Sequence, residues 1–184
     1  MVAAEFLAEP DELAVWLGKP ADDPKLLAAL RAATRRFRGA VGHDVDLLEG
    51  DEVTLDGNGR ETLLLPVWPT IAVTSVRLDG EELVEGTDFS WSDAGLLRRL
   101  GYQVWPNRLR CLVATYSHGW AMIPEDIAEV VLDQARTMFA VPAGVQSKAV
   151  GGQSVTFGAT AAVGVSSQWT AAVNRHKIRT SGDV

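Results

Sequence analysis

The chain has 184 residues, which is enough for one or two folded domains with a sizeable apolar core. Apolar residues make up 47% and charged residues 22%, a composition typical of globular proteins rather than of disordered chains. The single cysteine, Cys111, excludes a fold built on intrachain disulfides and suits a reducing compartment. No apolar run approaches the length of a membrane span, and the formal net charge of −7 argues against a basic nucleic-acid clamp.

The charge is unevenly distributed along the chain. Residues 1–133 hold 12 Lys/Arg and 23 Asp/Glu, a formal balance of −11, whereas residues 134–184 hold five and one, a balance of +4. An acidic body with a basic end predicts two surfaces that meet different partners. The arginines near residues 31–38 lie close to acidic residues in the sequence, so we do not expect them to read DNA.

Two helices are predicted in an N-terminal helical part, residues 1–50. The first begins at Pro10, has two acidic residues in its first turn and ends at Gly18. The second begins at Asp23-Pro24, because aspartate is a good N-cap and proline suits the first helical position. Its apolar residues recur at helical spacing and predict one buried face, formed by Leu26, Leu30, Ala33 and Phe37.

Residues 51–120 have the pattern of an antiparallel β-sheet. Short apolar runs alternate with turn signals such as Asp56-Gly57 and Asp79-Gly80, and Asp-Gly between β-rich runs is typical of tight hairpins. No connection is long enough for a helical crossover, so we expect a meander whose hairpin tips, near Gly57 and Gly80, are exposed and tolerate substitution. The predicted strands lie near residues 52–55, 61–65, 71–78, 82–84, 88–91, 96–99 and 109–116.

A third helix is predicted in residues 121–143, beginning at Pro124 and ending before Pro142. Residues 144–184 are rich in small and polar residues, with one period-two stretch at 154–157 and a basic tail. Such a segment can bury little apolar surface by itself, so we expect an extended arm. A chain cut after about Gly144 should therefore keep nearly the melting temperature of the full chain. The predicted fold class is α+β: helices packed with an antiparallel β-meander, plus an extended C-terminal arm.

The residues that carry chemistry do not form an active site. His43 and the two aspartates that follow it have the residue types of a metal site, but their spacing points to no shared centre. Ser117 and His118 are adjacent, so they face opposite sides of a strand and cannot pair as nucleophile and base. Cys111 lies in an apolar run, where a thiol packs rather than reacts. We predict no catalytic residue, no cofactor and no metal.

The C-terminal segment contains the candidate partner-binding residues. Trp169 is the only large aromatic in its weakly apolar surroundings, so it is either a core residue or an anchor for a partner's pocket. The period-two stretch is suited to pairing with a sheet edge, and the basic tail is suited to an acidic surface. The predicted set is Val155, Phe157, Trp169, Arg175, Lys177 and Arg179.

Several stretches match one family in their order and spacing. One is Val113-Ala114-Thr115-Tyr116-Ser117-His118-Gly119-Trp120, which leads into Pro124; the others are residues 11–18, 63–69, 73–76, 95–99, 105–106, 144–147 and 153–158. In this order they resemble the head-to-tail adaptor proteins of tailed bacteriophages, also called head–tail connector or head completion proteins. The end departs from the family, whose members often finish with an acidic-to-basic helix, whereas here residues 171–174 lead into a basic tail.

The resemblance implies a structural virion protein without enzymatic activity. Members of the family form a ring, usually dodecameric, beneath the portal of a DNA-filled head and extend its channel toward the tail. The implied partners are other copies of the chain, the portal protein, a downstream head–tail stopper or tail protein, and passing genomic DNA without sequence readout, but no membrane. The predicted partner-binding residues would then bind the portal or a neighbouring subunit.

The resemblance also implies a place in the cell and leaves one alternative open. The place is the head–tail neck of the virion, with the host cytoplasm as the site of assembly. The residues alone also allow a different class of protein, a small β-rich module that binds a peptide or sugar through exposed tryptophans. A stable monomer that does not bind the portal would favour this module over the ring subunit.

Overall fold

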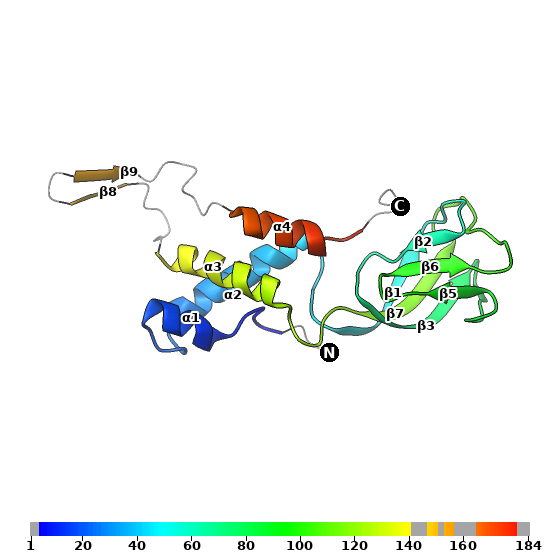
Figure 1. The fold of residues 1–184 in the computed structure, drawn as a ribbon, viewed down its shortest axis with the longest axis horizontal. Coiled ribbons are helices and arrows are strands. Elements are labelled where there is room, and N and C mark those ends of the chain that lie inside the picture. Colours follow the sequence, from blue (N-terminus) through cyan, green and yellow to red (C-terminus); the bar gives the residue numbers. More distant parts are fainter. Residues whose placement is uncertain (1–3, 141–146, 151–152, 157–164, 180–184) are drawn as a thin grey trace. The chain divides into compact units, whose positions relative to one another are not determined.

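The computed structural model describes residues 4–140, 147–150, 153–156 and 165–179 (Figure 1). It contains helices and antiparallel sheets, so the predicted α+β class is confirmed. The chain divides into a helical unit, formed by Ala4–Val41 with Ile123–Arg175, and a sheet unit, formed by Gly42–Met122 with the chain from His176. Within the described ranges, no helix is long and apolar enough to cross a membrane.

The first helices of the helical unit begin and end where the sequence predicts. Asp23 caps the second helix, because its Oδ1 accepts the backbone N–H groups of Lys25 and Leu26 at 2.8 and 3.1 Å. Gly18 ends the first helix in the left-handed conformation, with φ +60°. The helices of this unit are α1 (Pro10–Leu17), α2 (Pro24–Val41), α3 (Glu125–Ala140) and α4 (Ser167–His176).

The helices α2 and α3 bury apolar stripes at helical spacing. Both elements place their buried residues three and four positions apart, as an amphipathic helix requires. One polar residue, Thr34, is also buried, and its Oγ1 accepts the backbone N–H of Leu7 at 3.2 Å. The buried residues of α2 are Leu26, Ala29, Leu30, Ala33, Thr34, Phe37 and Val41, and those of α3 are Ile127, Val130, Val131, Leu132, Gln134 and Ala135.

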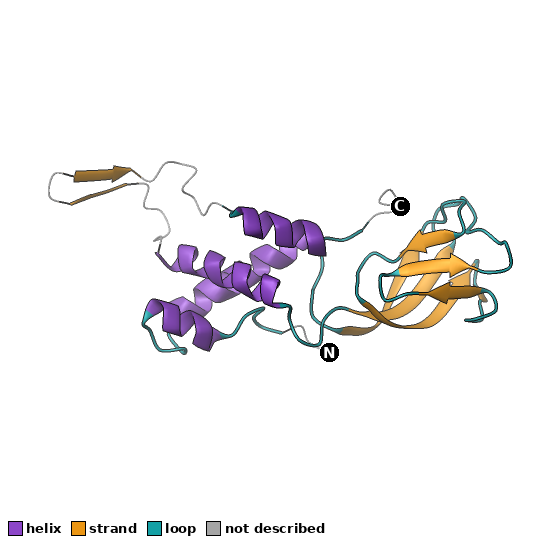
Figure 2. Cartoon of the chain, in the orientation of Figure 1, coloured by secondary structure: helices purple, strands orange, loops and turns teal. Residues whose placement is uncertain are grey.

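The sheet unit consists of two antiparallel sheets that share one apolar core (Figure 2). Trp105 lies in that core, and its Nε1 donates to the backbone oxygen of Leu97 at 3.3 Å. The four-stranded sheet has the order β1 (Leu48–Leu55), β7 (Leu112–His118), β3 (Thr70–Leu78) and β4 (Glu81–Glu82). The three-stranded sheet has the order β2 (Thr62–Leu64), β6 (Leu96–Arg99) and β5 (Phe89–Trp91).

The order of the strands corrects the predicted meander. The last strand, β7, lies between β1 and β3 and pairs with both in antiparallel orientation. Short connections exclude helical crossovers, but they do not decide which strands become neighbours. Leu112, Ala114 and Tyr116 of β7 are buried and alternate with half-buried residues, a pattern that suits the centre of a sheet with one face on the core.

One of the two predicted exposed hairpin tips is wrong. Gly80 is exposed, and a Cβ atom there would meet no other atom within 4 Å. Gly57 is buried, and a Cβ atom there would come 1.8 Å from the backbone oxygen of Pro106. Its own N–H donates to the backbone oxygen of Arg108 at 2.9 Å. The connection between β1 and β2 therefore packs against the loop before β7 and is not a free turn.

The prediction of an extended C-terminal arm is wrong for part of the segment, which forms a helix. Strands β8 (Ser147–Val150) and β9 (Gln153–Thr156) form an antiparallel hairpin, and α4 follows further along the chain. In α4 the buried residues Trp169, Ala172 and His176 recur at i, i+3 and i+7, which is helical spacing. The small polar composition of the segment conceals this pattern in the sequence.

Candidate functional site

The structure distributes the predicted partner-binding residues over different parts of the chain. Trp169 and Arg175 belong to the helical unit, whereas Lys177 and Arg179 belong to the sheet unit. Val155 lies in β9, where only the backbone is described, and Phe157 lies outside the described residues. The role of these residues in partner binding stays a prediction, but the surroundings of four side chains are known.

Trp169 packs in the core of the helical unit. The residue is 5% exposed, and its ring lies edge-on to Phe37, with ring centroids 5.4 Å apart and an interplanar angle of 84°. The guanidinium carbon of Arg36 lies 5.9 Å from the ring centroid. Of the two alternatives for Trp169, the structure shows core packing, and it leaves little of this side chain on the surface.

Arg175 forms an ion pair with α3. Its Nη1 lies 2.7 Å from Oδ2 of Asp126, while both side chains remain partly exposed to solvent. Such a surface pair contributes about 0–1 kcal/mol to stability. Arg175 therefore has an acidic partner within its own chain, whereas its basic surroundings in the sequence predict an acidic partner on another molecule.

An aromatic cluster of Trp68, Trp120 and His176 lies at the start of the tail. The ring of His176, a residue that is 5% exposed, stacks on Trp68 with centroids 5.7 Å apart and an interplanar angle of 11°. Trp120 meets the same imidazole edge-on at 6.3 Å, and the centroids of the two tryptophans are 6.1 Å apart. The tail from His176 is therefore packed on the sheet unit by its first residue.

Arg179 binds the sheet unit three residues further on. Its backbone N–H donates to the oxygen of Pro66 at 2.9 Å, and its Nη1 donates to the oxygen of Ala94 at 2.6 Å. Its guanidinium carbon lies 4.8 Å from the ring centroid of Trp68, a cation–π contact. Lys177, between these two contacts, is exposed. Arg179 thus uses its donors within its own chain, and Lys177 remains accessible to another molecule.

His118 is a buried residue that forms a polar pair with β1. It is 3% exposed, and its Nε2 lies 3.2 Å from Oδ2 of Asp51. Burial lowers the pKa of His118, and the hydrogen bond and charge of Asp51 offset this only in part. Burial also raises the pKa of Tyr116, whose ring is 4.7 Å from His118, to about 12. Ser117 does not pair with His118, since its Oγ accepts the N–H of Gly50 at 3.2 Å.

We expect the stability of the sheet unit to fall as the pH drops below the histidine range. The folded-state pKa of His118 is lowered, so between that value and the ordinary value of about 6.5 the unfolded chain binds a proton that the folded chain does not. Stability is therefore highest above this window and decreases through it. Thermal unfolding at about pH 5.5 and about pH 7.5 measures the difference, which should shrink in His118→Gln. An unchanged difference in that variant would contradict this assignment.

His43 is the residue that the sequence analysis weighed as a metal ligand. Its Nδ1 lies 2.6 Å from the backbone oxygen of Asp44, and its Nε2 lies 2.7 Å from the backbone oxygen of His176. Both ring nitrogens therefore face carbonyl oxygens. In the described parts of the chain, no three His, Cys, Asp or Glu side chains gather to hold a metal ion.

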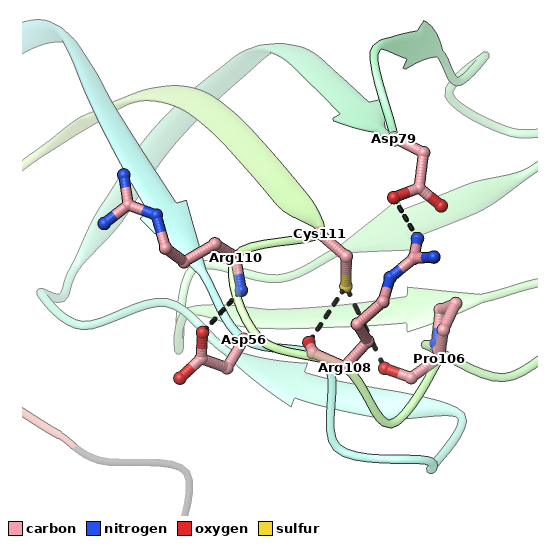
Figure 3. A network of polar contacts seen from close by, with 6 residues as sticks. All are labelled: Asp56, Asp79, Pro106, Arg108, Arg110 and Cys111. Carbon is pink, nitrogen blue, oxygen red and sulfur yellow. Dashed lines mark hydrogen bonds and ion pairs between the residues drawn. The ribbon is translucent and has the colours of Figure 1, made fainter.

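The thiol of Cys111 belongs to a hydrogen-bonded loop before β7. Cys111 is buried, and its Sγ donates to the backbone oxygen of Arg108 at 3.2 Å and, more weakly, approaches that of Pro106 at 3.9 Å. These contacts connect the loop with its neighbours, so the thiol has a packing role here. Figure 3 shows the surrounding network, in which Arg108 pairs with Asp79 and the N–H of Arg110 donates to Oδ1 of Asp56 at 2.7 Å.

The tryptophans of the sheet unit do not favour a peptide- or sugar-binding surface. Trp105 is fully buried, and Trp68, Trp91 and Trp120 are half-buried. The one largely exposed tryptophan, Trp16, is 67% exposed and belongs to α1 in the helical unit. Among the six tryptophans, all of them described, the alternative of a binding module that uses exposed tryptophans therefore has one largely exposed candidate, Trp16.

The candidate residues Trp169, Arg175 and Arg179 thus make their described contacts within the chain. The head completion protein family matches residues 14–178, so the chain belongs to this family. This match confirms the predicted family and makes the chain a structural head-to-tail connector protein.

Solved structures that are similar to the chain include two from necks of GTA particles. A chain from the neck of an empty GTA particle, computed with C6 symmetry, has a TM-score of 0.55 at 19% identity, over 99% of this chain and 95% of that chain. A chain from the neck of a native GTA particle, computed with C12 symmetry, has a TM-score of 0.48 at 21% identity, over 99% and 98%. The first likeness shows a shared fold. The comparison with curated proteins found no match.

Proposed function

We propose that the chain forms a ring of identical copies beneath the portal and joins the DNA-filled head to the tail. The observation that carries this proposal is the family match over residues 14–178, because it spans both units. The ring is dodecameric and extends the DNA channel of the portal. Its partners are neighbouring copies, the portal protein and a downstream head–tail stopper or tail protein. The chain acts by binding, without catalytic turnover.

The charge of the sheet unit suits a channel through which DNA passes. Gly42–Met122 holds 13 Asp/Glu and six Lys/Arg, a formal balance of −7. Negative charge disfavours tight contact with phosphates, since DNA affinity comes largely from Lys and Arg that replace counterions. DNA can then slide past the ring without sequence readout. The proposed place of this ring is the neck of the virion, after assembly in the host cytoplasm.

The β8–β9 hairpin is the proposed contact with the portal or a neighbouring copy. A two-stranded hairpin is at best marginally stable by itself in water. Pairing of β8 or β9 with a sheet edge of another molecule would satisfy its outer backbone groups. In this arrangement Val155 and Phe157 contribute side chains to the contact, and the exposed Lys177 meets an acidic surface.

Tail attachment to purified DNA-filled heads that lack this protein tests the proposal. We expect the added chain to restore attached tails in electron micrographs, and a chain without residues 147–156 to fail. Circular dichroism of both chains checks that the helical and sheet units remain folded. Heads that join tails equally well without the added chain would contradict the connector role, and normal attachment by the shortened chain would contradict the hairpin contact.

A further inference from the structure

The strand β1 is the longest edge strand of the two sheets that share the core. It has eight residues and pairs with β7 on one side, and within the described ranges no strand pairs with its other side. The remaining edge strands of these sheets, β2, β4 and β5, have two or three residues each. An edge strand presents backbone N–H and C=O groups with which a strand of another molecule can pair. The sheet can therefore be extended at β1.

The hydrogen bonds of β7 indicate which backbone groups of β1 face outward. The N–H of Asp79, directly after β3, donates to the backbone oxygen of Cys111 at 2.8 Å, so the backbone groups of Cys111 face β3. The next residue, Leu112, then faces β1, because successive residues of a strand turn their backbone groups to opposite sides. Leu112 pairs with Leu55, so Leu55 and Val53 face β7.

The residues between these positions face away from β7. The N–H and C=O groups of Glu52 and Thr54 point to the open side of β1, and both residues are exposed. Val53 and Leu55 alternate with them and pack, partly buried, against the core. An added strand would therefore meet two outward-facing residues and would cover a row of apolar side chains that is still half open.

The charge of β1 determines which strand fits beside it. Leu48–Leu55 holds three Asp/Glu and no Lys/Arg. A second copy of β1 is a poor partner, because like charges on neighbouring strands repel. Residues 147–156, which contain the β8–β9 hairpin, hold one Lys and no Asp/Glu. In β9 the apolar Val155 lies between Ser154 and Thr156, the alternation of a strand with one apolar face.

We propose that β9 of one copy pairs with β1 of the next copy and adds a strand to its four-stranded sheet. This inference rests on the proposed ring and names the edge to which the hairpin binds. Hydrogen bonds between the two backbones give the contact its affinity, as in other cases of strand addition. Each copy supplies one open edge and one hairpin, which is a head-to-tail contact that can close into a ring.

Cross-linking between two different variants of the full chain tests the pairing. One copy carries Thr54→Cys, and the other carries Ser154→Cys or Val155→Cys, of which one shares the face of residue 54 because neighbouring residues of a strand face opposite sides. The copies are mixed, bound to purified DNA-filled heads that lack this protein, and treated with a short bis-maleimide. We expect a linked pair of different copies, at least about tenfold more than with Glu81→Cys on the opposite edge.

The controls separate this pairing from other contacts. The native Cys111 is buried, so the unmodified chain should give no linked pair. A ring on the heads without linkage through position 54 would overturn the pairing and leave the ring intact. Linkage within one chain that carries both cysteines, without linkage between mixed copies, would also overturn it. A chain that does not bind the heads would overturn the ring as well.

Two substitutions at one position test the role of the backbone. Thr54→Pro removes an outward N–H group, and proline is tolerated where the N–H of an edge strand faces solvent. We expect it to reduce the amount of chain bound to heads, whereas Thr54→Val, which keeps the N–H group, should bind like the parent. Circular dichroism checks that both variants are folded. Equal binding by two folded variants would contradict strand addition at β1.

Discussion

Replacement of Trp169 by alanine is expected to destabilise the helical unit by about 3–5 kcal/mol, the usual cost of removing a buried tryptophan. The residue is 5% exposed and packs edge-on against Phe37, so the substitution removes apolar contacts and leaves a cavity beside α2. Because α4 buries few other apolar residues, we also expect it to separate from α2. Urea unfolding followed by circular dichroism measures the change in the free energy of unfolding.

Trp16 provides a matched control in the same unit. It is 67% exposed, and its ring meets Arg136 at 4.9 Å on the surface. Trp16→Ala should therefore cost less than about 1 kcal/mol. Equal and small losses in both variants would mean that Trp169 is not a core residue. The same packing corrects the expectation for a chain cut after about Gly144: it lacks Trp169 and should melt well below the full chain.

The helices α1, α2 and α3 could be predicted because their signals are local. Proline and acidic residues in the first turn, a capping aspartate and a terminal glycine all act within a few residues of the position they determine. Helix α4 has such signals too. The Oγ of Ser166 accepts the N–H of Trp169 at 3.1 Å, and three buried residues follow at helical spacing. The many small and polar residues around it led us to predict an extended arm in place of this helix.

The strands could be located from the sequence, but their order could not. Alternation of apolar residues and Asp-Gly turns depends on neighbours in the chain, and it marks β3 and β6 within one residue of their observed bounds. Whether β7 pairs with β1 depends on how two sheets close around one core. No local sequence pattern determines which strands pair.

The contacts of the basic tail could not be predicted from the sequence, because they join residues that lie far apart in the chain. Arg175 pairs with a residue 49 positions away, and Arg179 donates to one 85 positions away. The composition shows that the tail is basic, but it does not show that the acceptors lie in the same chain.

Gly57→Ala is expected to be among the most damaging single substitutions in the sheet unit, at more than about 4 kcal/mol. A Cβ atom would come 1.8 Å from the backbone oxygen of Pro106 and 3.0 Å from the Sγ of Cys111. The nearest of these atoms is backbone, so no side chain can rotate out of the way. The clash is relieved only if the loop before β7 moves. That movement breaks the hydrogen bond from the N–H of Gly57 to the backbone oxygen of Arg108 and disturbs the contacts of the buried Cys111 thiol.

Gly80→Ala separates this steric effect from the general cost of losing a glycine in a turn. Gly80 has φ +88°, and a Cβ atom there would meet nothing within 4 Å, so alanine should cost only the backbone strain, about 1–2 kcal/mol. Urea unfolding of both variants, followed by the fluorescence of the sheet-unit tryptophans, compares the two costs. Gly57 has no left-handed φ and therefore no such strain, so a loss at Gly57 no larger than the loss at Gly80 would contradict the close contact at Gly57. A much larger loss at Gly57 means that the loop before β7 is held by backbone packing that leaves no room for a methyl group.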